Sequence, residues 1–302
     1  SDLSVVAAAL EAAATYDGDT PTDQRSAIRR AANVILTNPD MLHVGILPHH
    51  GRWADFFHRL RYVVVDELHT LRGIFGTHVS MVLRRLRRLC HHYGSDPVFV
   101  FGSATIGNPG ELASRLCGLD VAVVDEDDSP RGEQWVVLWN PEMEDPEEGR
   151  RRSALAEATD LFVDLVRRDV STIVFARSRK STELIYRWAT ERLDASRRKR
   201  IASYRGGYLP QQRRRIESQL FSGELTGIVT TNALELGVDV GSLEAAILTT
   251  FPGTISSFRQ QAGRAGRRKD TSLVVLVAGE DALDRYFMTH PDELFTRPSE
   301  AV

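Results

Sequence analysis

The sequence predicts an α/β protein in which parallel sheets form two successive lobes. Short β-branched runs alternate with stretches of helical periodicity along the 302 residues. Several runs, such as Tyr62–Asp66 and Val98–Gly102, are mostly apolar, which is typical of parallel strands buried on both faces. Between the halves, Asn140–Arg152 combines prolines, acidic residues and an arginine run without apolar periodicity, and it is predicted to be a linker.

The lobes are expected at residues 1–140 and 153–302, with residues 141–152 joining them. We predict strands at Val34–Thr37, Tyr62–Asp66, Val98–Gly102, Val121–Val124, Val136–Trp139, Ser171–Phe175, Thr226–Thr231, Ala245–Thr249 and Ser272–Val277. Predicted helices include Val79–Leu89, Ala154–Val166, Glu183–Leu193 and Gln211–Leu220. Trp135 and Trp139 share one face of a strand and are expected in the core.

Composition excludes several classes of protein. With 42% hydrophobic and 26% charged residues, the chain is neither intrinsically disordered nor collagen-like. No apolar run approaches the roughly 20 residues that span a bilayer, so no membrane partner is expected. Two cysteines are too few for a four-cysteine zinc site and indicate a reducing, cytoplasmic setting. The net charge of −3 argues against coating of nucleic acid but allows a local basic groove.

Two strands are predicted to end in polar residues that suit phosphate chemistry. Tyr62–Asp66 ends in Asp66 and Glu67, where one carboxylate can hold Mg²⁺ through water and the next can deprotonate an attacking water. Val98–Gly102 is followed by Ser103 and Thr105, whose hydroxyls can switch hydrogen bonds between two sites. A polar turn and a helix N-cap are the simpler alternatives for these two segments.

Two segments of the second lobe carry further polar patterns. In Gln260–Arg267, Arg264 and Arg267 are three residues apart and would share a helix face, where two guanidiniums suit a phosphoryl transition state. A solvated basic helix face is the alternative. Thr230–Asp239 places hydroxyls and an amide at the predicted start of a helix, which suits a phosphodiester backbone.

Together these four segments resemble motifs II, III, V and VI of the superfamily 2 helicases, which are ATP-driven motors with two RecA-like lobes. Additional stretches look like the mitomycin repair factor A type, a group of RecQ-like DEAH-box DNA helicases. These stretches are Tyr16–Pro21, Thr37–His43, Arg72–Gly76 and Phe251–Ile255. The resemblance extends from Tyr16 to about Pro298.

The resemblance implies ATP and Mg²⁺ as cofactors, single-stranded or tailed duplex DNA as the partner, 3′–5′ movement and a role in DNA repair. Asp66 would hold Mg²⁺ through water, and Glu67 would be the catalytic base. His69, Ser103 and Thr105 would couple the nucleotide site to the DNA. The implied nucleotide contacts of the second lobe are Gly237, Asp239, the γ-phosphate sensor Gln260, and the arginine fingers Arg264 and Arg267. The implied single-strand path is lined by Thr37, Asn38, Arg177, Ser178, Tyr204, Arg205, Thr230 and Asn232.

The chain departs from this family in lacking a P-loop, which requires Gly-Lys followed by Ser or Thr. All its lysines, Lys180, Lys199 and Lys269, follow an arginine. We therefore expect an internal fragment of a longer helicase, with the P-loop segment upstream and an accessory domain downstream. The first RecA-like lobe would be truncated at its N-terminal side and would have exposed sheet edges. The fragment alone is expected to be inactive.

Two other functions remain open at this level. One is a nucleic-acid-binding module that kept the helicase fold without ATP turnover, and the other is an RNA helicase. The basic segments Arg84–Arg88, Arg197–Arg200 and Arg213–Arg215 are expected to be solvated surface. Cys90, His91 and His92 are contiguous and lack the spacing of metal ligands.

Overall fold

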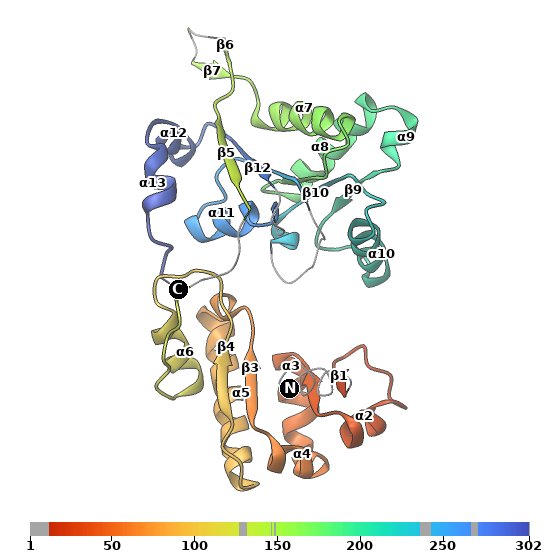
Figure 1. Cartoon of the computed structure of the whole chain (residues 1–302), viewed down its shortest axis with the longest axis vertical. Coiled ribbons are helices and arrows are strands. Elements are labelled where there is room, and N and C mark those ends of the chain that lie inside the picture. The colour runs from red at the N-terminus through yellow and green to blue at the C-terminus, as the bar shows by residue number, and fades with distance from the viewer. Residues whose placement is uncertain are drawn as a thin grey trace. The chain divides into compact units, whose positions relative to one another are not determined.

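The computed structural model describes residues 12–126, 132–145, 147, 149–235, 243–266 and 271–301 (Figure 1). The chain divides into two compact units. Unit 1 extends to Ala104 and includes Asn108–Val124, whereas unit 2 contains Thr105–Gly107 and the chain from Asp125 to Ala301. Both units are α/β and their main sheets are parallel, which confirms the predicted fold class.

Unit 2 is built on a six-stranded sheet in the order β5-β12-β11-β8-β10-β9, in which every neighbouring pair is parallel. The strands are β5 (Gln134–Trp139), β8 (Thr172–Phe175), β9 (Ile201–Tyr204), β10 (Gly227–Thr230), β11 (Ala245–Thr249) and β12 (Ser272–Val277). Strands β8, β10 and β11 are buried along their whole length, as continuously apolar runs predict.

Helices cover both faces of this sheet and create two apolar cores. On one face, α7 (Ala154–Arg167) and α8 (Arg179–Arg192) pack on alternate strand residues such as Val174 and Ile247. On the other face, Ile173 and Leu248 pack against the remaining long helices. These are α10 (Pro210–Phe221), α11 (Ile255–Ala262), α12 (Ala282–Thr289) and α13 (Pro291–Thr296). The smaller elements are α9 (Ala195–Arg198), the 3₁₀ turn η4 (Asn232–Leu234), and the antiparallel pair β6 (Met143–Asp145) and β7 (Arg150–Arg151).

Unit 1 has two separate parallel strand pairs among its described residues. They are β1 (Ala13–Thr15) with β2 (Val34–Leu36), and β3 (Tyr62–Val65) with β4 (Val98–Phe101). Helices α5 (Gly73–His92) and α6 (Pro109–Cys117) pack on β3 and β4 through Leu83 and Leu116. The other elements are α2 (Arg25–Ala31), α3 (Pro39–Met41), η1 (Leu42–Ile46), η2 (Leu47–Trp53), α4 (Ala54–Arg59) and η3 (Leu68–Thr70).

One face of the β3-β4 pair is open within the described part of the chain. Tyr62, Val64, Val98 and Val100 are between 46% and 70% exposed, while the alternate residues of both strands pack toward the helices. Burial on both faces, which the apolar runs predicted, is therefore wrong for this pair. What is exposed here is a face of the strand pair, and the exposed sheet edges expected for the first lobe stay a prediction.

The boundary between the units lies earlier than predicted. It falls between Val124 and Asp125 instead of at residues 141–152, because β5 pairs residue by residue with Ser272–Val277 of β12. The predicted linker carries the β6-β7 pair. The predicted strand Val121–Val124 has no strand pairing.

Trp135 and Trp139 are 60% and 39% exposed, so the prediction that they lie in the core is wrong. They belong to β5, which is an edge strand of the sheet within the described residues. Trp139 instead donates its indole N–H to Glu157 Oε2 at 3.1 Å. Strands β1 and β9 were not predicted. Among the described helices, none combines the length and apolar character that crossing a bilayer requires.

Candidate functional site

The acidic motif lies at the carboxyl end of β3. Strands β3 and β4 are parallel with Val65 paired to Phe101, so Asp66 and Gly102 leave the pair side by side. Asp66 is exposed, and its Oδ1 accepts a hydrogen bond from the Glu67 backbone N–H at 2.8 Å. Glu67 has a left-handed backbone with a φ of 53°, which non-glycine residues rarely adopt. Such strained residues cluster at functional sites.

Gly102 leaves the space that Asp66 occupies. A Cβ at position 102 would lie 2.9 Å from Asp66 Oδ1, which is shorter than ordinary contact. The backbone cannot easily give way, because Gly102 donates to Val65 and accepts from Leu68, both at 2.9 Å. The Asp66 carboxylate is therefore positioned by the Glu67 N–H on one side and by Gly102, which has no side chain, on the other.

His69 connects the two predicted motifs of unit 1. The Ala104 backbone N–H donates to His69 Nδ1 at 3.3 Å, so Nδ1 is the acceptor and the neutral imidazole carries its proton on Nε2. Nε2 lies 3.6 Å from Glu67 Oε2, which is longer than a hydrogen bond. The imidazole is 10% exposed and the Glu67 side chain 34%. One largely buried ring thus links the acidic residue after β3 to the backbone after β4.

The remaining predicted residues of unit 1 lie at strand ends. Ser103 Oγ donates to the Ala104 carbonyl at 2.7 Å. Thr37 and Asn38 are exposed after β2, and Asn38 Oδ1 accepts from the Met41 N–H at 2.8 Å, capping α3. Thr105 belongs to unit 2, where its carbonyl accepts from Ser256 Oγ at 3.3 Å. Ser103 and Thr105 do not cap α6, whose N-cap is Asn108, so the simpler alternative for this segment is wrong.

In unit 2, Arg177 follows β8, and its guanidinium binds a carboxylate and a backbone carbonyl of the same unit. It forms an ion pair with Asp281 and donates Nη2 to the Phe251 carbonyl at 2.9 Å. The loop that supplies this carbonyl is held by Asp284, whose Oδ1 accepts from the Phe251 N–H at 2.7 Å and whose pKa is raised by burial. Next to Arg177, Ser178 caps α8 by accepting from the Ser181 N–H at 3.0 Å.

Tyr204 and Arg205, after β9, are also paired. Tyr204 is 2% exposed and donates to Glu217 Oε1 at 2.5 Å. Burial, followed by this carboxylate, raises the pKa of Tyr204 to about 12. Arg205 donates to Glu183 Oε1 at 2.7 Å and lies 4.9 Å from the Tyr208 ring centre. A hydrogen bond to Glu183 raises the pKa of Arg205.

Thr230 and Asn232 differ in access to solvent. Thr230 is fully buried, and its Oγ1 makes no hydrogen bond within the described residues. Asn232 is exposed at the start of η4, a turn that Thr231 caps by accepting from the Ala233 N–H at 3.3 Å. Of these two residues, only Asn232 can meet a nucleic acid without rearrangement.

Arg264 does not lie on a helix, which corrects the predicted geometry. Helix α11 ends at Ala262 with Gly263 as its C-cap, so Arg264 lies in the following turn. Its side chain is buried and donates to the Glu235 carbonyl. Gln261 donates to Glu235 Oε2 at 2.9 Å, and Gln260 is half-buried. Gly237, Asp239 and Arg267 lie outside the described residues.

The sequence did not reveal the carboxylates that hold these side chains. Arg177 pairs with Asp281, which is 104 residues away. The partner of Arg205 is Glu183, 22 residues away, and that of Tyr204 is Glu217, 13 residues away. No local pattern signals partners that only the sheet topology brings together.

Asp66 fits the binding of a hydrated metal ion. Its Oδ1 is used by the Glu67 N–H, and its Oδ2 makes no hydrogen bond within the described residues. No group of three or more His, Cys, Asp or Glu that could hold a metal occurs in that part of the chain. Mg²⁺ does not need such a group, because it usually keeps several waters and takes one or two carboxylates.

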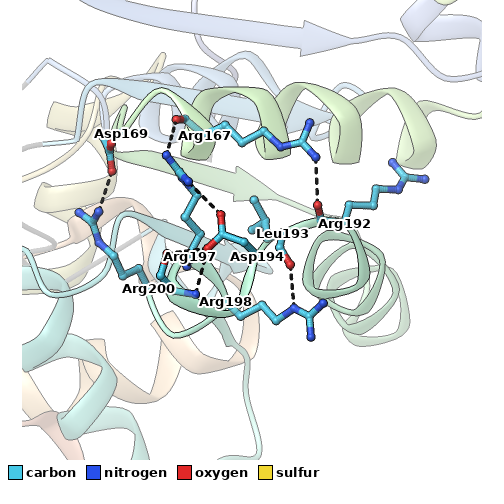
Figure 2. Close-up of polar contacts among 9 residues, drawn as sticks. Arg167, Asp169, Arg192, Leu193, Asp194, Arg197, Arg198 and Arg200 are labelled. Carbon is cyan, nitrogen blue, oxygen red and sulfur yellow. Dashed lines mark hydrogen bonds and ion pairs between the residues drawn. The ribbon is translucent and has the colours of Figure 1, made fainter.

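The arginines of the run Arg197–Arg200 form hydrogen bonds and ion pairs with other groups of unit 2 (Figure 2). Arg197 donates to the Arg167 carbonyl at 3.0 Å and pairs with Asp194, while Arg200 pairs with Asp169. Arg198 donates to the Leu193 carbonyl at 2.8 Å. These carbonyls lie at the ends of α7 and α8, where cations are favourable. The run therefore caps helices, which agrees with a protein-surface role rather than a phosphate site.

Two protein-family models match the chain, one in each half of the sequence. The DEAD/DEAH box helicase model matches residues 2–112, and the helicase conserved C-terminal domain model matches residues 154–269. The chain therefore carries a DEAD/DEAH box helicase domain followed by a helicase C-terminal domain, which agrees with its two parallel α/β units and the Asp-Glu-x-His motif at a strand end.

Several proteins similar to this chain are helicases. The crystal structure of the DUF1998 helicase MrfA bound to DNA is 47% identical, with a TM-score of 0.91 over 96% of this chain and 39% of that one. The ATP-dependent helicase YprA of Bacillus subtilis is 48% identical over 95% of this chain and 38% of its own length. The ATP-dependent helicase hrq1 of Schizosaccharomyces pombe is 44% identical over 94% of this chain and 28% of its own length. The chain thus spans less than two fifths of these curated relatives.

Proposed function

We propose that the chain is the motor core of an ATP-dependent DNA helicase that moves 3′ to 5′ along one strand and serves in DNA repair. The observation that carries the proposal is the path from Glu67 through His69 to the Ala104 backbone. It joins a carboxylate suited to activating water to the segment after the neighbouring strand. Support also comes from the two helicase domains and from the MrfA structure bound to DNA and AMPPNP, which is 47% identical.

In this proposal, unit 1 supplies the acid–base chemistry of hydrolysis. Glu67 takes a proton from the attacking water, and the Nε2–H of His69 orients the Glu67 carboxylate. Asp66 holds Mg²⁺ through water, and the ion supplies positive charge to the phosphates when it is bound. Gln260, Arg264 and Arg267 act from unit 2 on the γ-phosphate, and Gly237 and Asp239 contact the nucleotide.

Coupling to the nucleic acid follows from the position of Ala104. This residue lies between Ser103 and Thr105, so a shift of Glu67 that moves His69 also pulls on the backbone that presents both hydroxyls. In this proposal, the 3.6 Å approach of His69 to Glu67 and the hydrogen bond from the Ala104 N–H to His69 transmit a change at one end to the other. Ser103 and Thr105 are therefore proposed as the coupling residues.

The single-strand path of the proposal uses residues at the carboxyl ends of strands. Exposed Thr37, Asn38 and Asn232, with the helix cap Ser178, offer hydroxyl, amide and backbone N–H groups to phosphates. Arg177 and Arg205 reach a phosphate only by exchanging their carboxylate partners for it. Tyr204 and Thr230 are buried, so in this proposal they stabilise the loops of the path without contacting the nucleic acid.

DNA is favoured over RNA by the degree of similarity. Structures bound to DNA are 47% and 27% identical to this chain, whereas the RNA-bound neighbours are 15–17% identical and share the fold alone. A binding module without turnover is disfavoured because Asp66 and Glu67 are both present at the strand end and Glu67 has a strained backbone.

The proposal is tested with Glu67→Gln in a longer chain that also carries a P-loop. ATP binding should be retained, while hydrolysis should fall by about 10²–10⁴ because the water loses its base. Binding is measured with a fluorescent ATP analogue and hydrolysis by phosphate release with single-stranded DNA. Near-normal hydrolysis by this variant would remove Glu67 from the catalytic role and with it the proposed mechanism.

A further inference from the structure

Unit 1 contains an arginine-lined hollow outside the helicase motifs. It lies between α2, η2 and α4 and has a volume of about 420 Å³. Its lining residues are Ser26, Arg29, Arg30, Arg52, Trp53, Asp55, Phe56 and Arg59. Helix α4 ends at Arg59, just before β3 begins, whereas Asp66 follows the other end of β3. The hollow therefore lies toward the opposite end of that strand from the candidate active site.

Ion pairs with the described residues do not neutralise the charge of this hollow. Four guanidiniums and one carboxylate line it, and no ion pair joins any of these arginines to a carboxylate within the described residues. Arg30 and Arg59 donate Nε to carbonyls of their own helices, those of Ser26 at 3.3 Å and Asp55 at 3.2 Å. These bonds leave the terminal nitrogens of both guanidiniums available.

Several arginines of unit 2 are paired with carboxylates. Arg192, Arg197 and Arg200 each pair with an aspartate, as Figure 2 illustrates for the contacts of Arg197 and Arg200. Gathering like charges without counter-charges is unfavourable unless a ligand or solvent compensates them. The four arginines of the hollow lack such pairing within the described residues, although they lie close together.

A packed aromatic floor keeps the hollow open. Trp53 is 2% exposed and packs edge-on against Tyr16 and Phe56, with ring centres 4.9 Å and 5.7 Å apart. Trp53 belongs to an apolar cluster that also contains Phe57 and Leu86 of α5. Because this floor belongs to the core of unit 1, the backbone that carries the arginines is preformed.

We propose that this hollow binds a chain of phosphate groups, as carried by a nucleic-acid backbone or by a free nucleotide. Planar guanidiniums with several N–H donors match phosphate oxygens bidentately. A volume of about 420 Å³ is within the range of small-ligand sites. The half-buried ring of Phe56 provides an apolar wall for a sugar or base. This site does not depend on the proposed helicase activity.

The test is calorimetric titration of the 302-residue chain with sodium tripolyphosphate at low salt, without ATP or DNA. The double variant Arg30→Gln and Arg52→Gln should bind about tenfold more weakly or worse, because two charge-assisted contacts are lost. Both side chains are exposed, so folding should be preserved. The matched control is Arg88→Gln, which removes an exposed arginine in the last turns of α5 and should bind unchanged. Asp55→Asn removes the lining carboxylate and should tighten binding.

Two further titrations distinguish the sources of the phosphate chain. If it is a nucleic-acid backbone, the double variant also binds a deoxythymidine oligonucleotide more weakly. The slope of log K against log salt then falls by about 0.7 for each lost phosphate contact. If it is a free nucleotide, oligonucleotide binding is unchanged and ADP binding weakens. The proposal is overturned if tripolyphosphate does not bind, or if Arg88→Gln weakens binding as much as the double variant does. Equal binding of polyglutamate would also overturn it.

Discussion

Gly102→Ala tests whether the placement of the Asp66 carboxylate controls hydrolysis. The added Cβ would lie 2.9 Å from Asp66 Oδ1, whereas ordinary contacts begin at 3.4 Å, so the carboxylate must move by about 0.5 Å. Oδ1 cannot move without stretching its 2.8 Å bond from the Glu67 N–H. Because a displacement of about 1 Å can cost a factor of 10² in rate, we expect kcat for ATP hydrolysis to fall about tenfold.

The assay is steady-state phosphate release, with saturating single-stranded DNA, from a longer chain that carries a P-loop. The KM for ATP should change less than kcat, since the substitution displaces a group near the reacting atoms rather than a general binding contact. Gly51→Ala is the matched control, because a Cβ there meets no atom within 4 Å. A kcat for Gly102→Ala within twofold of the control would refute the reasoning.

Three further outcomes follow from the same residues. Arg267→Ala in the longer chain should lower ATP hydrolysis by about 10³–10⁵ and leave nucleotide-free DNA affinity nearly unchanged; the reverse pattern would make Arg267 a DNA contact. The 302-residue chain should show no DNA-stimulated ATPase or unwinding, because it contains no Gly-Lys-Ser/Thr, but should bind DNA weakly with steep salt dependence; turnover like that of an intact helicase would contradict this. Tyr204, with its pKa raised to about 12, contributes stability that is complete below pH 10 and is lost as pH rises toward 12. In thermal unfolding, Tyr204→Phe should lose less stability than the unmodified chain over that interval, and parallel curves would refute the assignment.

Local patterns were sufficient for most of the central strands and for the acidic motif of this protein. A continuous run such as Thr226–Thr231 buries both faces, so its composition alone predicts a central parallel strand. The Asp66-Glu67-Leu68-His69 segment combines an apolar strand with polar residues at its end, which predicts the place of the acidic pair without any knowledge of its neighbours. These are short-range properties, and the structure has them where the sequence predicts them.

Tertiary pairing decided what the sequence could not. The sequence assigned β5 to the first lobe because it precedes a polar segment, but its backbone hydrogen bonds are satisfied by β12, more than 130 residues later. Arg264 was predicted on a helix face from three-residue spacing, yet the helix ends at Ala262 and the guanidinium donates to the Glu235 carbonyl. The His69 tautomer and the carboxylate partners of Arg177 and Arg205 depend on groups from other elements. The periodicity of a sequence indicates which residues are buried. The topology brings distant segments together and thereby determines the partner of each strand edge and of each buried charge.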